Sequence, residues 1–260
     1  MKLIHTIFSA ITLTVRITLA TLAIVFIFES FPLAFSIFGS SMQGSRSIQM
    51  PETPEGEIAV SYGWSQSNIC HGDLTVSIPL NFYEEYCDAE RIRGLSNYTE
   101  YVTHTGDTDS IVLITAQIEE QANDYQLNST ETVNFTAAFV QQGIDYVTDR
   151  ISKDKEEYAR YPLETLVDGV GDCEDTAILL ADILWQLGYD VALLYLNPDD
   201  GAAHMALGVG GNGVKGKWNY EHNGTKYYYL ETTAKGWELG EIPNKYEKVE
   251  AEVYEINSTL

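Results

Sequence analysis

Residues 161–187 read YPLETLVDGVGDCEDTAILLADILWQL and are followed by Gly188. After Cys173, apolar residues recur at steps of three and four, which predicts a helix, and a glycine at 188 is typical of a helix C-terminus. We expect a buried helix from about Cys173 to Leu187. The N–H groups and dipole at a helix N-terminus stabilise negative charge, so this position favours a thiolate nucleophile. A small buried cysteine that packs as a hydrophobe is the alternative.

The overall composition is that of a folded, acidic protein. With 260 residues and 45% hydrophobic residues, the chain can form one sizeable domain or two small ones. Asp and Glu number 38 against 15 Lys and Arg, which gives a net charge of -23. Because affinity for nucleic acid depends on Lys and Arg replacing counterions along the phosphates, we expect no nucleic-acid partner.

Residues 1–42 are apolar with few charges, and they predict an N-terminal transmembrane helix that anchors the protein. Residues 7–28 and residues 17–38 both have the required length. We favour 17–38 because Lys2 and Arg16 then lie on its N-terminal side, which places the C-terminal domain outside the cytoplasm of a single-pass membrane protein. A cleaved signal peptide and a hydrophobic hairpin remain alternatives.

Composition divides the rest of the chain into three parts. Residues 43–57 are rich in Gly, Ser, Pro and Glu, as in an extended stalk. Residues 58–150 are expected to form the N-terminal helical and strand part of the ectodomain, and residues 151–260, which include Cys173, its core.

Patterning predicts the elements of the N-terminal part. Residues 62–79 read as two strands about a turn, because Leu74, Val76 and Ile78 alternate. Residues 110–122 and 130–148 have the apolar spacing of amphipathic helices. We expect these helices to pack beside the helix that begins at Cys173.

Three strands are predicted downstream of the cysteine helix, at residues 189–196, 204–209 and 226–231. A helix followed by such strands indicates an antiparallel sheet. His204 begins the second strand and Glu231 ends the third, so antiparallel pairing can bring both to one edge of the sheet.

Cys173, His204 and Glu231 are the residue types of a thiol-based catalytic triad. An imidazole takes the proton of a thiol that attacks a carbonyl, and a carboxylate holds the imidazole in the correct tautomer. Considered alone, His204 is more simply a strand histidine whose ring is hydrogen-bonded, and Glu231 a solvated glutamate at a strand end. Taken together in this order, the three residues favour catalysis.

Three motifs in the same order resemble a known family. GDCEDTA at 171–177, HMALGV at 204–209 and YLETTAKGWELG at 229–240 are similar to the core motifs of the transglutaminase-like superfamily, in particular its bacterial and archaeal cysteine-peptidase-like branch. The resemblance extends over about residues 160–243. It implies an α+β, papain-like core in which the nucleophile helix packs on an antiparallel sheet.

The resemblance also implies the role of each residue. Cys173 is the nucleophile, His204 the general base and acid, and Glu231 the third member, where the family more often has aspartate. The Cys173 backbone N–H is expected to supply one oxyanion-hole donor, with Tyr161 or Gln142 as candidates for the second.

Other chemistry of the cysteines is also predicted. In an oxidising exterior, the simplest pairing of three cysteines is a Cys70–Cys87 disulfide with Cys173 free. A metal site formed by Cys173, His204 and Glu231 would lack the close ligand spacing of known metal motifs. We therefore expect no metal and no cofactor.

The function expected from the sequence is that of a membrane-anchored cysteine enzyme. It would act on a protein or peptide substrate, at peptide or glutamine amide bonds, through an acyl-thioenzyme, with hydrolysis favoured over transfer because water is always available. The alternative is a non-catalytic tethered binding or assembly module with the same fold. The acids beside Cys173 and the glutamate at position 231 motivate that alternative.

Overall fold

The computed structural model describes residues 44–53, 55–68, 70–104, 108–199, 201–211 and 213–256. The elements are β1 (Ser45–Gln49), β2 (Glu57–Ser65), β3 (His71–Pro79), α2 (Leu80–Asp88), η1 (Leu95–Asn97), α3 (Thr99–Val102), α4 (Thr108–Asp124), α5 (Ser129–Gly143), β4 (Asp145–Tyr146), α6 (Asp149–Ser152), α7 (Pro162–Asp168), β5 (Val170–Gly171), α8 (Cys173–Gln186), β6 (Asp190–Leu196), β7 (His204–Gly210), β8 (Asn219–His222), β9 (Thr225–Leu230) and β10 (Ala251–Glu255).

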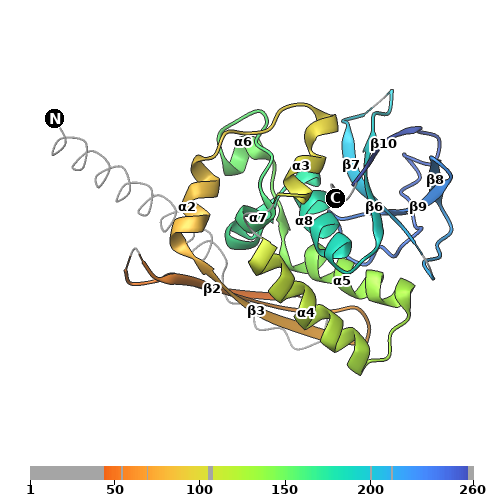
Figure 1. Cartoon of the computed structure of the whole chain (residues 1–260). Helices are drawn as coiled ribbons and strands as arrows, with labels where there is room; N and C mark the ends of the chain where they lie inside the picture. Colours follow the sequence, from red (N-terminus) through yellow and green to blue (C-terminus); the bar gives the residue numbers. More distant parts are fainter. Residues whose placement is uncertain are drawn as a thin grey trace, which may run out of the picture. The chain divides into compact units, whose positions relative to one another are not determined.

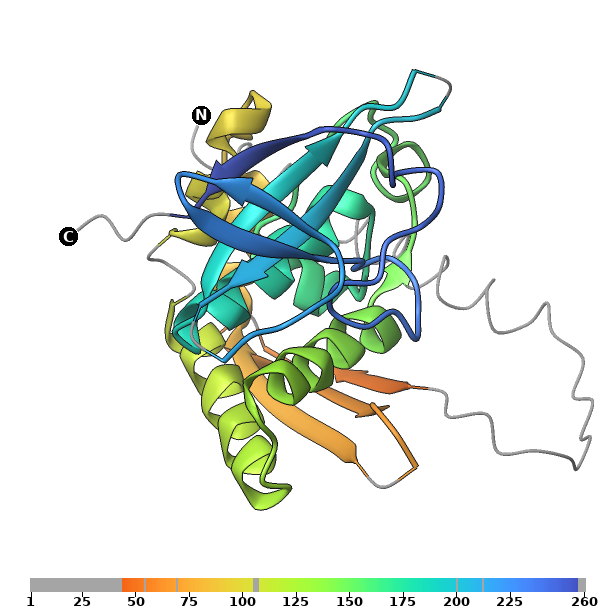
Figure 2. The same ribbon diagram turned by 90° about the vertical axis from the view of Figure 1, so that its right-hand side faces the viewer.

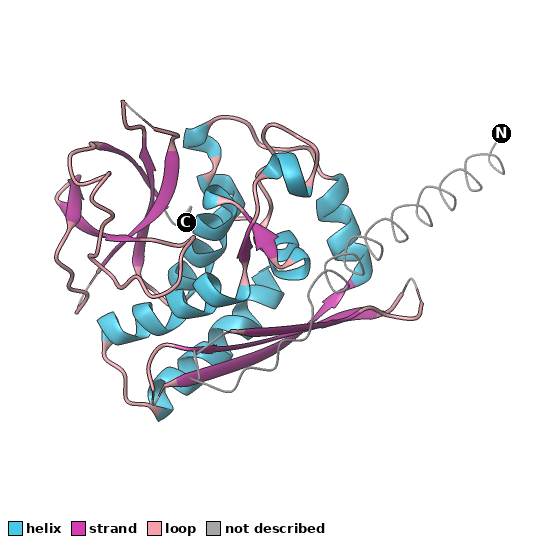
Figure 3. Cartoon of the chain, turned by 180° about the vertical axis from the view of Figure 1, so that it is seen from behind, coloured by secondary structure: helices cyan, strands magenta, loops and turns pink. Residues whose placement is uncertain are grey.

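Two antiparallel sheets enclose a layer of helices (Figures 1 and 3). The first sheet has the order β1-β2-β3, and α4 and α5 pack against it. The second has the order β10-β6-β7-β9-β8, and α8 packs against its strands β6 and β7. Figure 2 looks onto this second sheet, with the darkest blue strand, β10, beside β6. The mixed α and β architecture with antiparallel sheets agrees with the predicted fold class.

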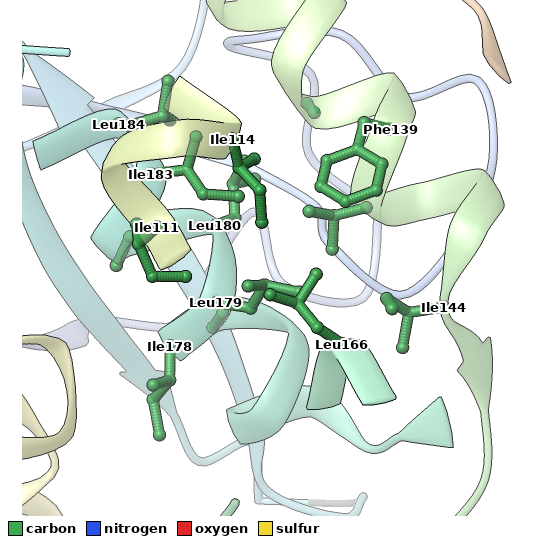
Figure 4. Packing of buried hydrophobic residues seen from close by; sticks show 14 of the residues in the cluster. Ile111, Ile114, Phe139, Ile144, Leu166, Ile178, Leu179, Leu180, Ile183 and Leu184 are labelled. Carbon is green, nitrogen blue, oxygen red and sulfur yellow. The ribbon is translucent and has the colours of Figure 1, made fainter. Parts of the chain in front are cut away.

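Helix α8 is the centre of the hydrophobic core (Figure 4). It contacts α3, α4, α5 and α7 as well as the second sheet, and its residues from Glu174 to Leu184 are all buried. The helix is thus buried on all sides rather than along one stripe. The side chains around Leu180 include Ile114 of α4 and Phe139 of α5.

Backbone hydrogen bonds end α8 where the sequence predicts. Gly188 has φ 84°, and its N–H donates to Trp185 O at 2.9 Å, while Tyr189 N–H donates to Leu184 O at 3.1 Å. These two bonds form a Schellman motif, which needs a left-handed residue and therefore favours glycine at 188. The helix thus has a defined length between the site at its N-terminus and the turn into β6.

The structure differs from the sequence-based description in three places. Residues 43–57 were expected as a stalk, but Ser45–Gln49 pairs with β2 as an edge strand, because its side chains alternate between half-buried and exposed. The division expected after residue 150 is not a structural boundary, since α5 and α8 on either side of it pack together. The helix expected over 130–148 ends at Gly143.

The predicted transmembrane segment lies in residues 1–42, outside the described residues. Within the part of the chain that is described, no helix combines the length and the hydropathy needed to cross a bilayer.

The predicted Cys70–Cys87 disulfide is wrong, because both cysteines are free. Cys70 precedes β3, and Cys87 lies near the end of the following helix. Nine extended residues of β3 span about 30 Å at roughly 3.3 Å per residue. A disulfide requires Cα atoms within about 7 Å of each other, so proximity in sequence did not give proximity in space.

Candidate active site

Cys173 is the first residue of α8 and lines a cavity of about 580 Å³. The chain enters the helix through β5, where a Cβ added at Gly171 would lie 2.7 Å from the Asp175 side chain. The Asp172 N–H donates to Asp175 Oδ2 at 3.2 Å and fixes the first turn. The thiol therefore lies at a helix end whose first N–H groups have no acceptor within the helix.

The structure brings His204 and Glu231 together at one end of the second sheet. His204 begins β7, Glu231 follows β9, and Leu207 lies opposite Leu230 in their antiparallel register. His204 Nε2 and Glu231 Oε2 are 3.1 Å apart. Because Nε2 faces the carboxylate, Nδ1 is the ring nitrogen left to exchange a proton with the thiol.

All three predicted catalytic residues line the same cavity. The thiol also lies near the start of β7, since the backbone of Met205, next to His204, partly offsets the raised pKa of Cys173. The described residues that line the cavity are Tyr146, Cys173, Pro198, Gly201, Ala202, Ala203, His204, Glu231, Thr233, Ala234, Trp237, Pro243, Lys245 and Tyr246.

The Glu231 carboxylate is held by several donors. Its Oε2 accepts from the Tyr229 hydroxyl at 2.9 Å, and its Oε1 accepts from Thr233 Oγ1 at 2.7 Å and from the N–H groups of Thr232 and Thr233 at 3.1 Å each. Burial alone would raise the pKa of Glu231, but the hydrogen bond and charge of His204, with the Thr233 hydrogen bonds, lower it to about 2. Glu231 is thus an ionised partner for the imidazole.

The surroundings of the Cys173 thiol raise its pKa, whereas those of Glu231 lower the pKa of its carboxyl group. Burial raises the pKa of Cys173 above its ordinary value, and the charge of Glu174 raises it further. Cys173 Sγ donates to Glu174 Oε2 at 3.2 Å, and burial and Asp172 raise the pKa of Glu174 to about 10. Burial and acidic neighbours therefore oppose the thiolate that the helix N-terminus is expected to favour.

Comparison with known proteins adds to this geometry. Residues 114–214 match the family model of a transglutaminase-like domain. This part of the chain is therefore similar to a transglutaminase-like domain. The match includes Cys173 and His204 and ends before Glu231. No curated protein matches the chain in sequence.

Two residues expected in the oxyanion hole of the transglutaminase-like domain do not line the cavity. The Tyr161 ring packs against Tyr86, Tyr101 and His104 at ring-centroid distances of 4.6–5.0 Å. The Gln142 side chain bonds both the N–H and the carbonyl of Ser65, at 3.2 and 2.8 Å. The Tyr161 ring packs against other rings and the Gln142 amide bonds the first sheet. Neither side chain is therefore placed to supply the predicted second oxyanion-hole donor.

Sequence reasoning missed Gln141, the neighbour of Gln142. Its side chain donates to Glu231 O at 2.8 Å and to Trp237 O at 3.0 Å, and accepts from Gly236 N–H at 3.2 Å. Gln141 thereby holds the loop that carries the third catalytic residue. Adjacent helical positions differ by about 100° in direction, so only the orientation of α5 separates the two glutamines.

Two tyrosines of the cavity also carried no sequence signal. The Tyr246 ring stacks on the His204 ring with centroids 5.0 Å apart and an interplanar angle of 1°. Tyr146 lines the cavity from β4, and its pKa is raised to about 12, first by partial burial and then by the charge of Cys173. Both lie far from their partners in sequence, and tertiary packing alone brings them together.

A buried ion network supports the first turn of α8. Arg160 is fully buried, and its guanidinium contacts Asp149 at 3.1 Å, Asp168 at 3.3 Å and Asp175. Its backbone N–H also donates to Asp175 Oδ1 at 2.7 Å. Since Asp175 holds the backbone of Asp172, the network links Arg160 to the position of the nucleophile.

Three carboxylates beside the nucleophile have the arrangement of a hard-cation site. Oxygen atoms of Asp149, Asp172 and Glu174 lie within 4.8 Å of one another. Asp172 Oδ1 is buried without a hydrogen-bond partner. Carboxylate oxygens are the donors that Ca²⁺ and Mg²⁺ prefer, so these three residues are the ones in this region that could hold such a cation.

Proposed function

We propose that this protein is a cysteine hydrolase that acts on peptide or glutamine amide bonds through an acyl-thioenzyme. The observation that carries the proposal is the His204–Glu231 pair, 3.1 Å apart, in the same cavity as a cysteine at a helix N-terminus. An ionised carboxylate orients the imidazole and stabilises its protonated form. The match of residues 114–214 to a transglutaminase-like domain supports the same class of chemistry.

The first half of the reaction forms the thioester. The Cys173 proton moves to His204 Nδ1 as Sγ attacks the carbonyl carbon, and Glu231 stabilises the imidazolium. The raised pKa of the thiol in the free site means that this transfer occurs with the substrate in place rather than before binding. The Cys173 N–H is expected to donate to the oxyanion. His204 then protonates the leaving amine as the C–N bond breaks.

The second half releases the acyl group. His204 takes a proton from water as the water oxygen attacks the thioester carbonyl. The C–S bond then breaks, and His204 returns the proton to Sγ, which gives a carboxylic acid and the free thiol. Hydrolysis is favoured over transfer because water is always available and no site for a second amine is identified among the described residues. Anchoring through residues 17–38 is part of the proposal because of their apolar composition, and the place of the domain outside the cytoplasm because of Lys2 and Arg16.

A direct assay separates hydrolysis from transfer. The protein is incubated with unfolded casein, with and without a fluorescent primary amine, and new N-termini, released ammonia and bound fluorescence are measured. If the protein is a hydrolase, the wild type should release new N-termini or ammonia and attach little fluorescent amine to casein. The Cys173→Ala variant should give none of these products. Products that persist in Cys173→Ala contradict the proposal, and fluorescence as the main product favours transfer.

A non-catalytic binding or assembly module is the second candidate. It is favoured by one observation, the acids that raise the pKa of Cys173. A thiol that reacts with iodoacetamide no faster than a simple model thiol supports this candidate, as does a cellular phenotype that survives Cys173→Ala. Rapid alkylation of Cys173 counts against it.

A further inference from the structure

The described residues that line the cavity include one cationic and one acidic side chain, and only the cationic one is available to a ligand. Among its described lining residues, Lys245 is the only cation and Glu231 the only acid. Both Glu231 oxygens already accept hydrogen bonds from His204, Tyr229 and the Thr233 region. Within the part of the chain that is described, no carboxylate forms an ion pair with Lys245. The ammonium group is therefore available to a ligand.

One aromatic ring, that of Tyr246, connects Lys245 to the catalytic histidine. The Lys245 Nζ lies over the Tyr246 ring, 4.4 Å from the centroid. The same Tyr246 ring stacks on His204. A cation–π contact of this kind restrains an otherwise flexible lysine. The ammonium group and the catalytic imidazole thus both contact one aromatic ring.

We propose that the cavity selects substrates that carry a carboxylate close to the reacting carbonyl, and that Lys245 recognises this carboxylate. The inference rests on the proposed function of Cys173. The remaining described lining residues are mostly apolar or neutral, including Trp237, Pro198 and Pro243, so they offer packing but no competing charge. The substrate class is then an acidic peptide, with its carboxylate on a side chain or at the chain end.

The overall charge of -23 does not remove this local preference. Charges separated by more than about 8 Å are largely screened at physiological ionic strength. A contact between a bound carboxylate and the Lys245 ammonium is shorter than that. The acidic surface therefore slows the approach of anionic ligands, while Lys245 favours them once they are in the cavity.

Four small alkylating probes test the inference without knowledge of the natural substrate. They are N-chloroacetyl-glutamic acid α-amide, its glutamine counterpart, N-chloroacetyl-glycine and N-chloroacetyl-glycinamide. In each reaction Sγ bonds to the chloromethyl carbon, the C–Cl bond breaks, chloride leaves with the electron pair, and the thiol proton is lost to solvent. Mass spectrometry of digests follows Cys173, with Cys70 and Cys87 as internal references.

The measured quantity is the rate of the acid probe divided by the rate of its neutral partner. We expect Lys245→Met to lower this ratio at Cys173 about fivefold for at least one pair, while Lys226→Met, which removes an exposed lysine outside the cavity, leaves it unchanged. The pair that responds identifies a side-chain or a terminal carboxylate. A ratio unchanged by Lys245→Met overturns the inference alone. A Cys173 inert to all four probes overturns the proposed function and the inference together.

Discussion

The surroundings of Glu231 fit the length of its side chain. His204 and Tyr229 share one oxygen, and Thr232 and Thr233 share the other. A shorter side chain would have to give up some of these contacts. The side chain of Glu231 thus has the length that these hydrogen bonds require.

Replacing Glu231 tests its role in orienting the imidazole. Glu231→Gln keeps the shape but removes the charge that stabilises the imidazolium, and we expect kcat to fall about 100-fold or more. Glu231→Asp is expected to fall less, because a carboxylate remains. Steady-state kinetics on the substrate found with casein measures both. A Glu231→Gln enzyme with the wild-type kcat would exclude this role.

The low pKa of Glu231 predicts a loss of stability in acid. A carboxylate whose folded pKa is below its ordinary 4.5 contributes stability that is complete above that pH and is lost as the pH falls towards about 2. The difference of pKa corresponds to about 3 kcal/mol. Urea unfolding between pH 5 and pH 2 should show this loss in the wild type, and a correspondingly weaker pH dependence in Glu231→Gln. Parallel curves for the two proteins would be the opposite result.

Helix α4 protects an edge of the first sheet through its side chains. The Gln117 and Gln121 amides each bond both the N–H and the carbonyl of a β3 residue, Thr75 and Asp73 respectively, at 2.7–3.1 Å. Tyr125 does the same for His71. Four helical residues rise about 6 Å and two strand residues about 6.6 Å, so the spacings match. The helix thus takes the place of a neighbouring strand.

Removing these amides should destabilise the sheet. We expect Gln117→Ala with Gln121→Ala to lower the free energy of unfolding by about 2–3 kcal/mol, since four partly exposed hydrogen bonds are lost. Glu119→Ala with Glu120→Ala, on the exposed side of the same helix, is the matched control. Equal urea midpoints for the two double variants would show that the edge contacts contribute nothing.

The ion network under α8 is expected to be a larger source of stability. Arg160→Met leaves Asp149, Asp168 and Asp175 without their shared cation, and loss of one partner from a buried network costs about 3–5 kcal/mol. Arg150→Met is the control, because Arg150 and Glu156 are 77% and 85% exposed and 3.5 Å apart. Urea unfolding measures both variants. An Arg160→Met protein as stable as Arg150→Met would contradict the structural role of the network.

Considering the molecule as a whole, sequence patterns predicted the elements better than their contacts. The spacing of apolar residues and the glycine at 188 located α8, because both are local properties of the chain. The alternation of strand residues and the turn signals located β6 and β7 in the same way. The candidate triad came from motif order, and the structure places its members around one cavity.

The contacts that escaped prediction join distant parts of the sequence. Tyr246 stacks on a histidine 42 positions earlier, and Gln141 holds a loop more than 90 positions later. No periodicity encodes such pairs, since they depend on how the helices and sheets pack. The prediction of a Cys70–Cys87 disulfide failed for the same reason, because it inferred closeness in space from closeness in sequence. Local rules therefore identified the elements, and tertiary packing decided the site.

The central claim is that Cys173 carries an acyl group with the help of His204. The most direct measurement is acylation by p-nitrophenyl acetate, with rapid quenching and mass spectrometry to locate the acetyl group. The account predicts a single acetyl on Cys173 in the wild type and an acylation rate reduced about 100-fold or more in His204→Gln. Acetylation elsewhere with Cys173 unmodified, or equal rates in the wild type and in a folded His204→Gln, would contradict it.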